Sequence, residues 1–303
     1  MSGATDAERV YSALDESARL LDLSCSRDAV WPLLSAFEDV LGDAMIVFSM
    51  ASGGRSGELD FSFSVPAAYG DPYAIALSNG LITASDHPVH ALHADIVEHC
   101  PIGMFGVDGE INGGFKKIYI FFPKDDLQSL AKLAEIPSMP RSTAENAELF
   151  ARHGMETVQM VSIDYHRRTV NLYFGDLPAE CLEPYRVRAM LREMDLPEPS
   201  EQGLEFARQS FSAYPTLSWD SSRIERICLA VISTDATALP ARTSPRIAHF
   251  AKNAPDAYTD AHTLVYGLTV VPGGEYYKMG SYYQISDQQR VLLKTFDALE
   301  GRS

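Results

Sequence analysis

The sequence predicts an α+β fold: a ten-stranded antiparallel β-barrel with a solvent-filled lumen, surrounded by α-helices. Ten segments alternate between apolar and polar residues, and short turns join them in pairs, which makes antiparallel hairpins. The polar residues share one face, as in Lys117-Ile118-Tyr119-Ile120, so the apolar face is left for the helices and the polar face for the interior. Ten strands in one twisted sheet tend to close, and side chains do not fill a barrel of that width.

The elements follow one another in five rounds of helix, strand, turn and strand. Amphipathic patterns predict helices at 6–23 and 27–41, the second capped by Ser26, before strands 44–51 and 57–65, which Gly53-Gly54 joins. Helical stretches at 72–79 and 88–99 then precede strands 103–110 and 115–122, which Gly113-Gly114 separates.

The later rounds repeat this order. Helices 125–134 and 142–153, the latter opened by the capping box Ser142-x-x-Glu145, precede strands 156–164 and 168–174. Helices 184–194 and 200–208 precede strands 210–218 and 223–233. Helix 244–252 precedes strands 262–271 and 275–284, and helix 287–299 closes the chain. Because no linker rich in Pro, Gly or Ser divides residues 1–303, we expect a single domain, with a two-domain α+β protein as the alternative.

Composition and charge limit the partners. The chain has 303 residues, 46% of them hydrophobic, and a formal net charge of -16 that repels nucleic acid and anionic lipid. No apolar run approaches the roughly 20 residues of a membrane helix, and residues 1–10 do not resemble a signal peptide. The four cysteines form no C-x-x-C pair and read as reduced core thiols. We therefore expect a cytoplasmic monomer without nucleic-acid or membrane partners.

Polar and charged residues on the inner face form the candidate site. They are Ser49, Asp60, Ser62, Lys117, Tyr119, Arg167, Thr169, Asn171, Tyr173, Ser212, Tyr214, Arg226, Lys278 and Tyr282. Lys117, Arg226 and Lys278 come from different strands and can converge on one small polyanion, such as a diphosphate of about three negative charges. A lone strand Lys is more often a surface residue, a lone Asp such as Asp60 a turn or edge residue, and Tyr282 or Phe211 alone a packing residue. The shared direction of the cations, the amide and the tyrosines nevertheless favours a ligand site.

Several motifs do not indicate a site. His87, His90 and His93 are three residues apart, but no acidic or sulfur partner is implied, so a solvated helix face is preferred over zinc. The glycine-rich stretch 52–57 lacks the ending of a phosphate-binding loop and reads as a hairpin turn.

Six stretches resemble one known family. They are Val47-Phe48-Ser49-Met50-Ala51-Ser52-Gly53, Glu58-Leu59-Asp60-Phe61-Ser62, Gly113-Gly114-Phe115-Lys116-Lys117, Val170-Asn171-Leu172-Tyr173-Phe174, Ser212-Ala213-Tyr214-Pro215-Thr216-Leu217 and Glu275-Tyr276-Tyr277-Lys278. The chain is similar, nearly from end to end, to the soluble bacterial aromatic prenyltransferases of the ABBA, or PT-barrel, family, of the naphterpin-pathway type. That family fold is a ten-stranded antiparallel barrel ringed by helices.

The resemblance implies roles for individual residues. The diphosphate would be bound by Ser49, Lys117, Asn171, Tyr214, Arg226 and Lys278. Tyr119 and Tyr173 would contact the prenyl chain and, with Lys278, act in catalysis, and Asp60 would support Mg²⁺. The aromatic substrate would be bound by Gln159, Phe211, Ser212, Val265, Tyr282, Gln289 and Leu292. The sequence departs from the family pattern at Arg167, Thr169 and Ser281. These departures bear on the identity of the acceptor and on the position of its prenylation more than on the reaction itself.

The implied activity is electrophilic aromatic substitution. A geranyl or dimethylallyl group would pass from its diphosphate to an electron-rich aromatic of the hydroxylated naphthalene type. Two alternatives remain open: a non-catalytic barrel that binds a phosphorylated or aromatic ligand, and a hydrolase that releases the prenyl alcohol.

Overall fold

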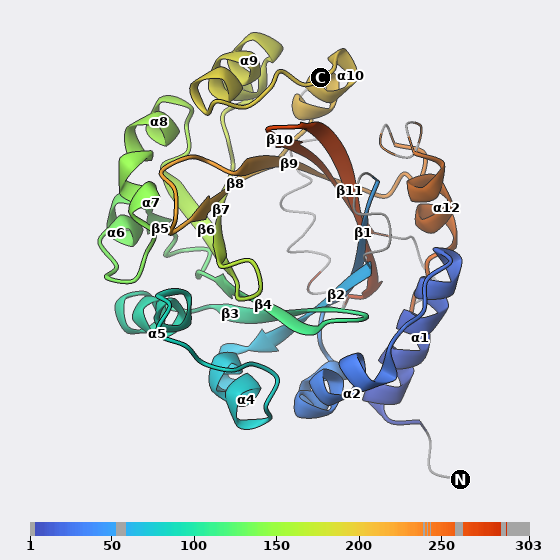
Figure 1. Cartoon of the computed structure of the whole chain (residues 1–303). Coiled ribbons are helices and arrows are strands. Elements are labelled where there is room, and N and C mark those ends of the chain that lie inside the picture. Colours follow the sequence, from blue (N-terminus) through green and yellow to red (C-terminus); the bar gives the residue numbers. More distant parts are fainter. Residues whose placement is uncertain are drawn as a thin grey trace.

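The strands of the barrel lie where the alternation predicts them. The computed structural model describes residues 4–52, 59–238, 240, 242, 244–257, 263–285 and 289. Its barrel strands are β1 Ile46–Ala51, β2 Leu59–Pro66, β3 Met104–Glu110, β4 Gly114–Phe121, β6 Thr157–Asp164, β7 Thr169–Gly175, β8 Ser212–Ser218, β9 Arg226–Ser233, β10 Leu264–Val271 and β11 Gly274–Gln284 (Figure 1). The predicted turn at Gly53-Gly54 lies outside the described residues.

The sheet closes on itself. Its order runs β4-β3-β2-β1-β11-β10-β9-β8-β7-β6, and β4 also pairs with β6, from Lys117 opposite Asp164 to Phe121 opposite Met160. Every pair is antiparallel, so the predicted ten-stranded antiparallel barrel is confirmed. Closure leaves no exposed edge within this ring of strands.

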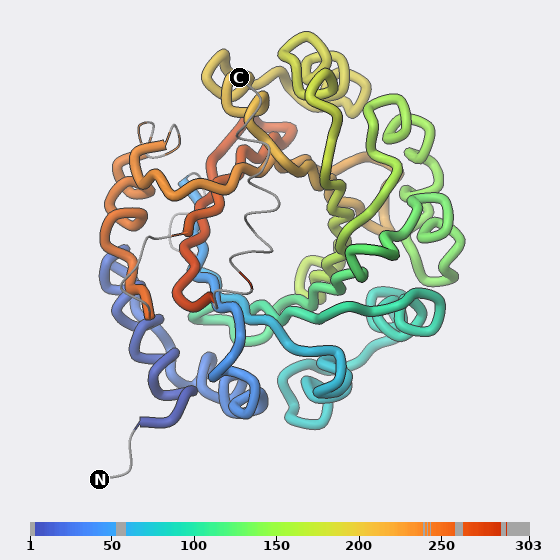
Figure 2. Tube along the Cα trace, turned by 180° about the vertical axis from the view of Figure 1, so that it is seen from behind, coloured from blue at the N-terminus to red at the C-terminus, as the bar shows by residue number. Residues whose placement is uncertain are grey.

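Helices surround the barrel, as the ribbon view and the Cα tube seen from behind show (Figures 1 and 2). They are α1 Asp6–Leu20, α2 Arg27–Ala36, α3 Glu38–Leu41, α4 Pro72–Ser78, α5 Val89–His99, α6 Leu130–Ala134, α7 Arg141–Glu145, α8 Ala147–Arg152, α9 Pro184–Glu193, α10 Glu201–Ala207 and α12 Pro245–Asn253. Short 3₁₀ turns follow at Ala67–Tyr69 and Ala179–Leu182. Of the predicted closing helix, only Gln289 lies among the described residues.

Three helix predictions need correction. The helix expected at 125–134 begins only at Leu130, because the preceding β5 (Gln128–Ser129) pairs with β6 and Ser129 caps α6. The capping box at Ser142 is wrong: α7 starts directly after Pro140, and the Ser142 hydroxyl instead donates to the Ser218 carbonyl at 3.0 Å. The helix expected at 27–41 is interrupted at Phe37 between α2 and α3.

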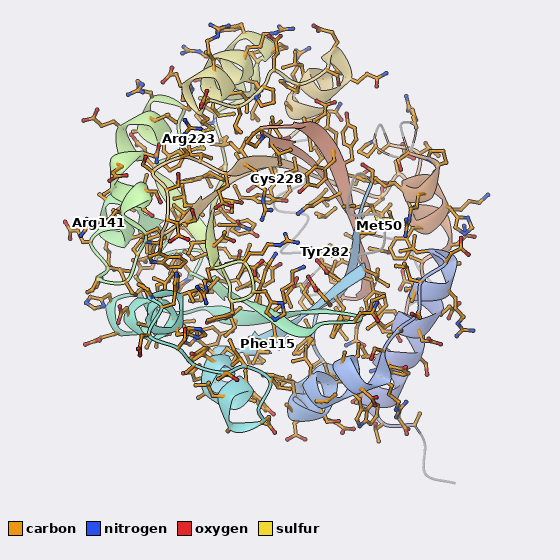
Figure 3. The ribbon with its side chains drawn as sticks, in the orientation of Figure 1. Met50, Phe115, Arg141, Arg223, Cys228 and Tyr282 are labelled. Atoms are coloured by element: carbon orange, nitrogen blue, oxygen red, sulfur yellow. The ribbon has the colours of Figure 1, made fainter. Side chains whose placement is uncertain are left out.

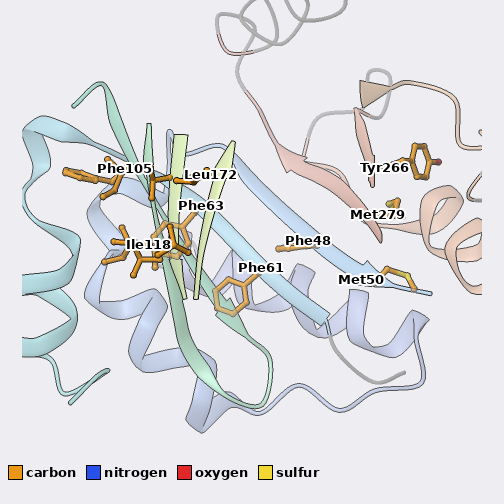
Figure 4. Close-up of a cluster of buried hydrophobic side chains, with 14 of the residues drawn as sticks. Phe48, Met50, Phe61, Phe63, Phe105, Ile118, Leu172, Tyr266 and Met279 are labelled. Atoms are coloured by element: carbon orange, nitrogen blue, oxygen red, sulfur yellow. The ribbon is translucent and has the colours of Figure 1, made fainter. Parts of the chain in front are cut away.

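The hydrophobic core lies between the barrel and the helices. The outward residues Phe48, Phe61, Ile118 and Leu172 are fully buried there, and Figure 4 shows them in one apolar cluster. Complete burial of one such side chain stabilises a protein by about 1.5–3 kcal/mol, so this outer layer carries much of the stability. The polar strand face is thereby left to the lumen, as predicted.

Two further sequence predictions concern the cysteines and membrane segments. All four cysteines are free, as expected, although Cys228 faces the lumen and not the outer core. Among the described residues, the helices are too short or too polar to cross a membrane.

The histidine stretch is not a solvated helix face throughout. His93 of α5 is only 1% exposed, and its ring stacks on Tyr73 of α4 at 6.0 Å between centroids. Burial lowers the pKa of His93, while Asp71, whose Oδ1 lies 3.5 Å from Nδ1, opposes this shift. No group of three potential metal ligands occurs within the described ranges, so the zinc alternative gains no support there.

We expect acid to destabilise the fold through His93. Because its folded-state pKa is lowered, the unfolded chain binds a proton at higher pH, and the free energy of unfolding falls once pH drops below about 6.5. Urea unfolding between about pH 7.5 and 5.5 measures this loss. His93→Met, which stays apolar and cannot titrate, should show a flatter pH dependence than wild type; an identical dependence would contradict the assignment.

Candidate active site

The barrel encloses a cavity of about 1200 Å³. The predicted site residues that line it are Ser49, Asp60, Lys117, Tyr119, Gln159, Asn171, Tyr173, Phe211, Ser212, Tyr214, Arg226, Val265, Lys278, Tyr282 and Gln289. Figure 3 shows Tyr282 towards the centre of the ring of strands and Arg141 at the outer edge of the molecule. Ser62 and Arg167 also line the cavity, whereas Thr169 is buried beside it and Leu292 lies outside the described residues.

Three cations meet inside the lumen. Lys117, Arg226 and Lys278 come from β4, β9 and β11. Burial, followed by the positive charges of Arg226 and then of Lys117, lowers the pKa of the Lys278 ammonium to about 7. Such mutual repulsion requires proximity, so the structure brings together the three cations that the sequence places on separate strands.

A chain of hydrogen bonds orients two of the polar residues. The Arg226 Nε donates to Thr216 Oγ1 at 3.0 Å, and the Thr216 hydroxyl donates to Asn171 Oδ1 at 2.7 Å. The Asn171 amide in turn donates to the Tyr173 hydroxyl at 3.4 Å. Thr216 of β8, which the sequence analysis did not single out, therefore holds the guanidinium and the amide at fixed positions on the two strands that flank its own.

Aromatic faces form a second part of the wall. Tyr173 and Tyr214 stack at 4.4 Å between centroids, and Tyr119 stands edge-on to Tyr173 at 6.4 Å. Burial raises the pKa of Tyr173 to about 12 and the pKa values of Tyr119 and Tyr214 well above their usual range, so all three phenols stay protonated. The Cys228 thiol, 2.9 Å from the Tyr214 hydroxyl, also belongs to this wall and was missed from the sequence.

A β-bulge turns one further lysine inwards. The strand register between β3 and β4 shifts at Asp108/Gly109. Asp108 lies opposite Lys117 and Gly109 lies opposite Phe115, so Lys116 is the extra residue of the bulge. Lys116, 2% exposed, contacts Asp60 Oδ2 and Glu110 Oε1, each at 2.7 Å. Strict alternation would point Lys116 at the helices; Gly109 inside a strand pattern is the sequence signal that could have revealed the bulge.

Two more carboxylates were missed. Burial raises the pKa of Asp108 to about 6, and the Tyr119 hydroxyl donates to its Oδ2 at 3.1 Å. Burial also acts to raise the pKa of Asp164, but Lys117 at 3.5 Å and the Arg167 backbone N–H outweigh it, and the pKa is lowered.

At another part of the wall, Gln159 lies over a glycine. A Cβ on Gly175 would come within 2.0 Å of the Gln159 Nε2, which donates to Asp176 Oδ2 at 3.3 Å. The absence of a side chain at 175 therefore allows this position of the amide. Beside it, the Ser212 hydroxyl donates to the Phe174 carbonyl at 2.9 Å.

The lumen can therefore hold a polyanion joined to an apolar group. Cations and neutral donors would bind the anionic end, while protonated tyrosine rings offer faces to the apolar part. Walls of hydrogen-bonded strands limit the access of water to a bound ligand.

Comparison with known proteins identifies relatives along nearly the whole chain. Residues 5–294 match the family described as aromatic prenyltransferase Orf2. A flaviolin linalyltransferase of Streptomyces virginiae is 45% identical over 295 residues, 97% of each chain. A 5,10-dihydrophenazine-1-carboxylate 9-dimethylallyltransferase of Streptomyces anulatus is 43% identical over 300 residues, 98% of this chain and 100% of the relative. A furaquinocin biosynthesis prenyltransferase of Streptomyces sp. (strain KO-3988) is 44% identical over 93% of this chain and 91% of the relative.

We expect the Lys278 amine to titrate near neutral pH. Arg226→Gln removes the largest charge contribution and should raise the pKa of Lys278 towards the ordinary value of about 10.4. Reductive ¹³C-methylation with NMR detection measures the titration, and Lys278→Arg assigns the signal. A Lys278 signal that titrates at the same pH with and without Arg226 would contradict this account.

Proposed function

The chain belongs to the aromatic prenyltransferase Orf2 family, and from this premise we propose how its lumen performs prenyl transfer. The chain is an enzyme that transfers a prenyl group to an aromatic acceptor, as its relatives do. The alternative of a barrel that only binds its ligand is therefore set aside. We propose a geranyl or dimethylallyl diphosphate as donor and an electron-rich, hydroxylated naphthalene-type aromatic as acceptor.

The cluster of Lys117, Arg226 and Lys278 is the observation that supports a diphosphate donor most directly. Burial lowers the pKa of Lys278, and repulsion from Arg226 and Lys117 adds to this shift. A diphosphate would bind between them with the help of Ser49, Asn171 and Tyr214. Its negative charge would raise the pKa of Lys278, so binding above pH 7 should be accompanied by proton uptake.

Asp60 is suited to support Mg²⁺. Its Oδ2 is held by Lys116, while its buried Oδ1 has no hydrogen-bond partner among the described residues. A hard cation that prefers oxygen ligands fits such an atom. When bound, the ion would neutralise charge on the leaving diphosphate.

The tyrosine wall would stabilise the allylic cation that forms when the carbon–oxygen bond of the donor breaks. The ring faces of Tyr119, Tyr173 and Tyr214 can each contribute about 2 kcal/mol, or roughly thirtyfold in rate, when the contact is desolvated. Because their hydroxyls stay protonated, the rings do not present phenolate oxygens that would capture the cation.

The acceptor would then attack this cation through carbon. A π-electron pair of the acceptor forms the new carbon–carbon bond, a proton leaves the same carbon to restore aromaticity, and diphosphate is the second product. Gln159, Phe211, Ser212, Val265, Tyr282 and Gln289 would line the acceptor position.

The donor length and the cellular setting are part of the proposal. Both donors are retained because one relative is a linalyltransferase and another a dimethylallyltransferase. We further propose that the enzyme works in the cytoplasm, for which the four free cysteines argue, and that it works there as a monomer.

We expect a prenylated product from a defined mixture. Incubation with geranyl diphosphate, Mg²⁺ and 1,6-dihydroxynaphthalene should give an acceptor heavier by one geranyl unit, measured by mass spectrometry; dimethylallyl diphosphate is run in parallel. Prenyl alcohol released without any prenylated aromatic would instead indicate a hydrolase.

Replacing Lys278 or Arg226 by alanine should abolish turnover. Lys278→Ala and Arg226→Ala each withdraw positive charge from the leaving group and should lower kcat/KM by at least about a hundredfold. Lys252→Ala, on the exposed surface of α12, is the matched control and should retain wild-type activity. Wild-type rates in the two lumen variants, with folding verified by circular dichroism, would refute the assignment.

A further inference from the structure

Two lumen carboxylates face the same space from neighbouring strands. Asp60 of β2 lies opposite Glu110 of β3, and Asp108 of β3 lies opposite Ser62 of β2, so Asp60 and Asp108 are diagonal neighbours on the inner face. Diagonal positions of this kind are about 7–8 Å apart, a separation that two carboxylates can span with one ion between them.

Each of the two carboxylates is held by one oxygen only. Lys116 Nζ donates to Asp60 Oδ2 at 2.7 Å, and the Tyr119 hydroxyl donates to Asp108 Oδ2 at 3.1 Å. Both Oδ1 atoms are buried and have no hydrogen-bond partner among the residues that the structure describes. Because an unsatisfied buried charged acceptor is unfavourable, the pair forms a site that a ligand would complete.

The net charge of the side chains around the two carboxylates is one that a divalent cation would balance. Asp60, Asp108 and Glu110 supply three negative charges, and Lys116, which contacts Asp60 and Glu110, supplies one positive charge. The neighbouring Lys117 is paired with a fourth carboxylate, Asp164, at 3.5 Å. A surplus of two negative charges is left beside the cations expected to bind the diphosphate.

We propose that Asp108 is a second carboxylate support of the magnesium ion, acting through its Oδ1 together with Asp60 Oδ1. Lys116 and Tyr119 are the positioning residues, because they hold the two Oδ2 atoms and so direct the Oδ1 atoms at the shared space. Mg²⁺ is commonly held by one or two carboxylates with phosphate oxygens and water, and this donor set fits that pattern. The inference rests on the proposed use of magnesium with an allylic diphosphate.

Binding of Mn²⁺ to the full chain tests the assignment independently of turnover. Electron paramagnetic resonance measures free Mn²⁺ during titration, in the presence of a geranyl diphosphate analogue whose bridging oxygen is replaced by sulfur and which does not ionise. Asp60→Asn and Asp108→Asn should each weaken Mn²⁺ binding by at least about tenfold, and Tyr119→Phe, which removes only the positioning hydroxyl, by up to about tenfold. Asp108→Ser is the second variant; its agreement with Asp108→Asn excludes an effect specific to the amide, and circular dichroism reports folding.

Asp164→Asn is the matched control. It removes the same charge from an equally buried lumen carboxylate that pairs with Lys117, and Mn²⁺ binding should stay within about twofold of wild type. An equal loss in Asp164→Asn would show that only the total charge of the lumen matters and would overturn the inference.

The outcomes also separate this inference from the proposed function. Loss of Mn²⁺ binding in Asp60→Asn with wild-type binding in Asp108→Asn would overturn the role of Asp108 alone. A wild-type enzyme that forms prenylated product but binds no Mn²⁺ would overturn both metal assignments and leave the transferase activity standing. A wild-type enzyme without prenylated product would refute the proposed donor and acceptor, whatever its metal binding.

Discussion

The burial of charge inside a closed barrel is the constraint on which the rest of this structure depends. Taking an isolated charge out of water is expensive, so buried charges must be paired or must await a ligand. In the described lumen, Lys116 is paired with Asp60 and Glu110, and Lys117 with Asp164. Lys278 is buried near the like charges of Arg226 and Lys117, and its lowered pKa records the cost.

The inverted arrangement of polar and apolar faces makes such a lumen possible. Phe48, Phe61 and Ile118 pack outwards against the helices, so the hydrophobic core is a shell around the barrel and not its centre. The stability supplied by this shell offsets the cost of a polar interior that is only partly satisfied. Closure through β4 and β6 removes the free strand edges and completes the wall.

Ionised and neutral groups divide the lumen between them. The cations lie with Asn171 and Thr216, whose hydrogen bonds fix Arg226, while the tyrosines at 119, 173 and 214 remain neutral because burial raises their pKa values. This division suits a substrate with an anionic head and an apolar tail. Ionisation of the donor would separate charge, and the two parts of the wall would stabilise opposite charges.

The sequence by itself determined the ten strands, the outward apolar face and most of the lumen wall, because the two-residue period of a strand fixes the direction of side chains within each segment. Only the tertiary structure decided which of these residues meet. The bulge that turns Lys116 inwards depends on the pairing of β3 with β4, and the capping box at Ser142 failed because its hydroxyl binds a carbonyl far away in sequence. Asp108, Asp164 and Thr216 gain their importance from partners on other strands. Which residues of two strands become partners is decided only when the strands pair in the closed barrel, so the periodicity within one segment does not specify these contacts.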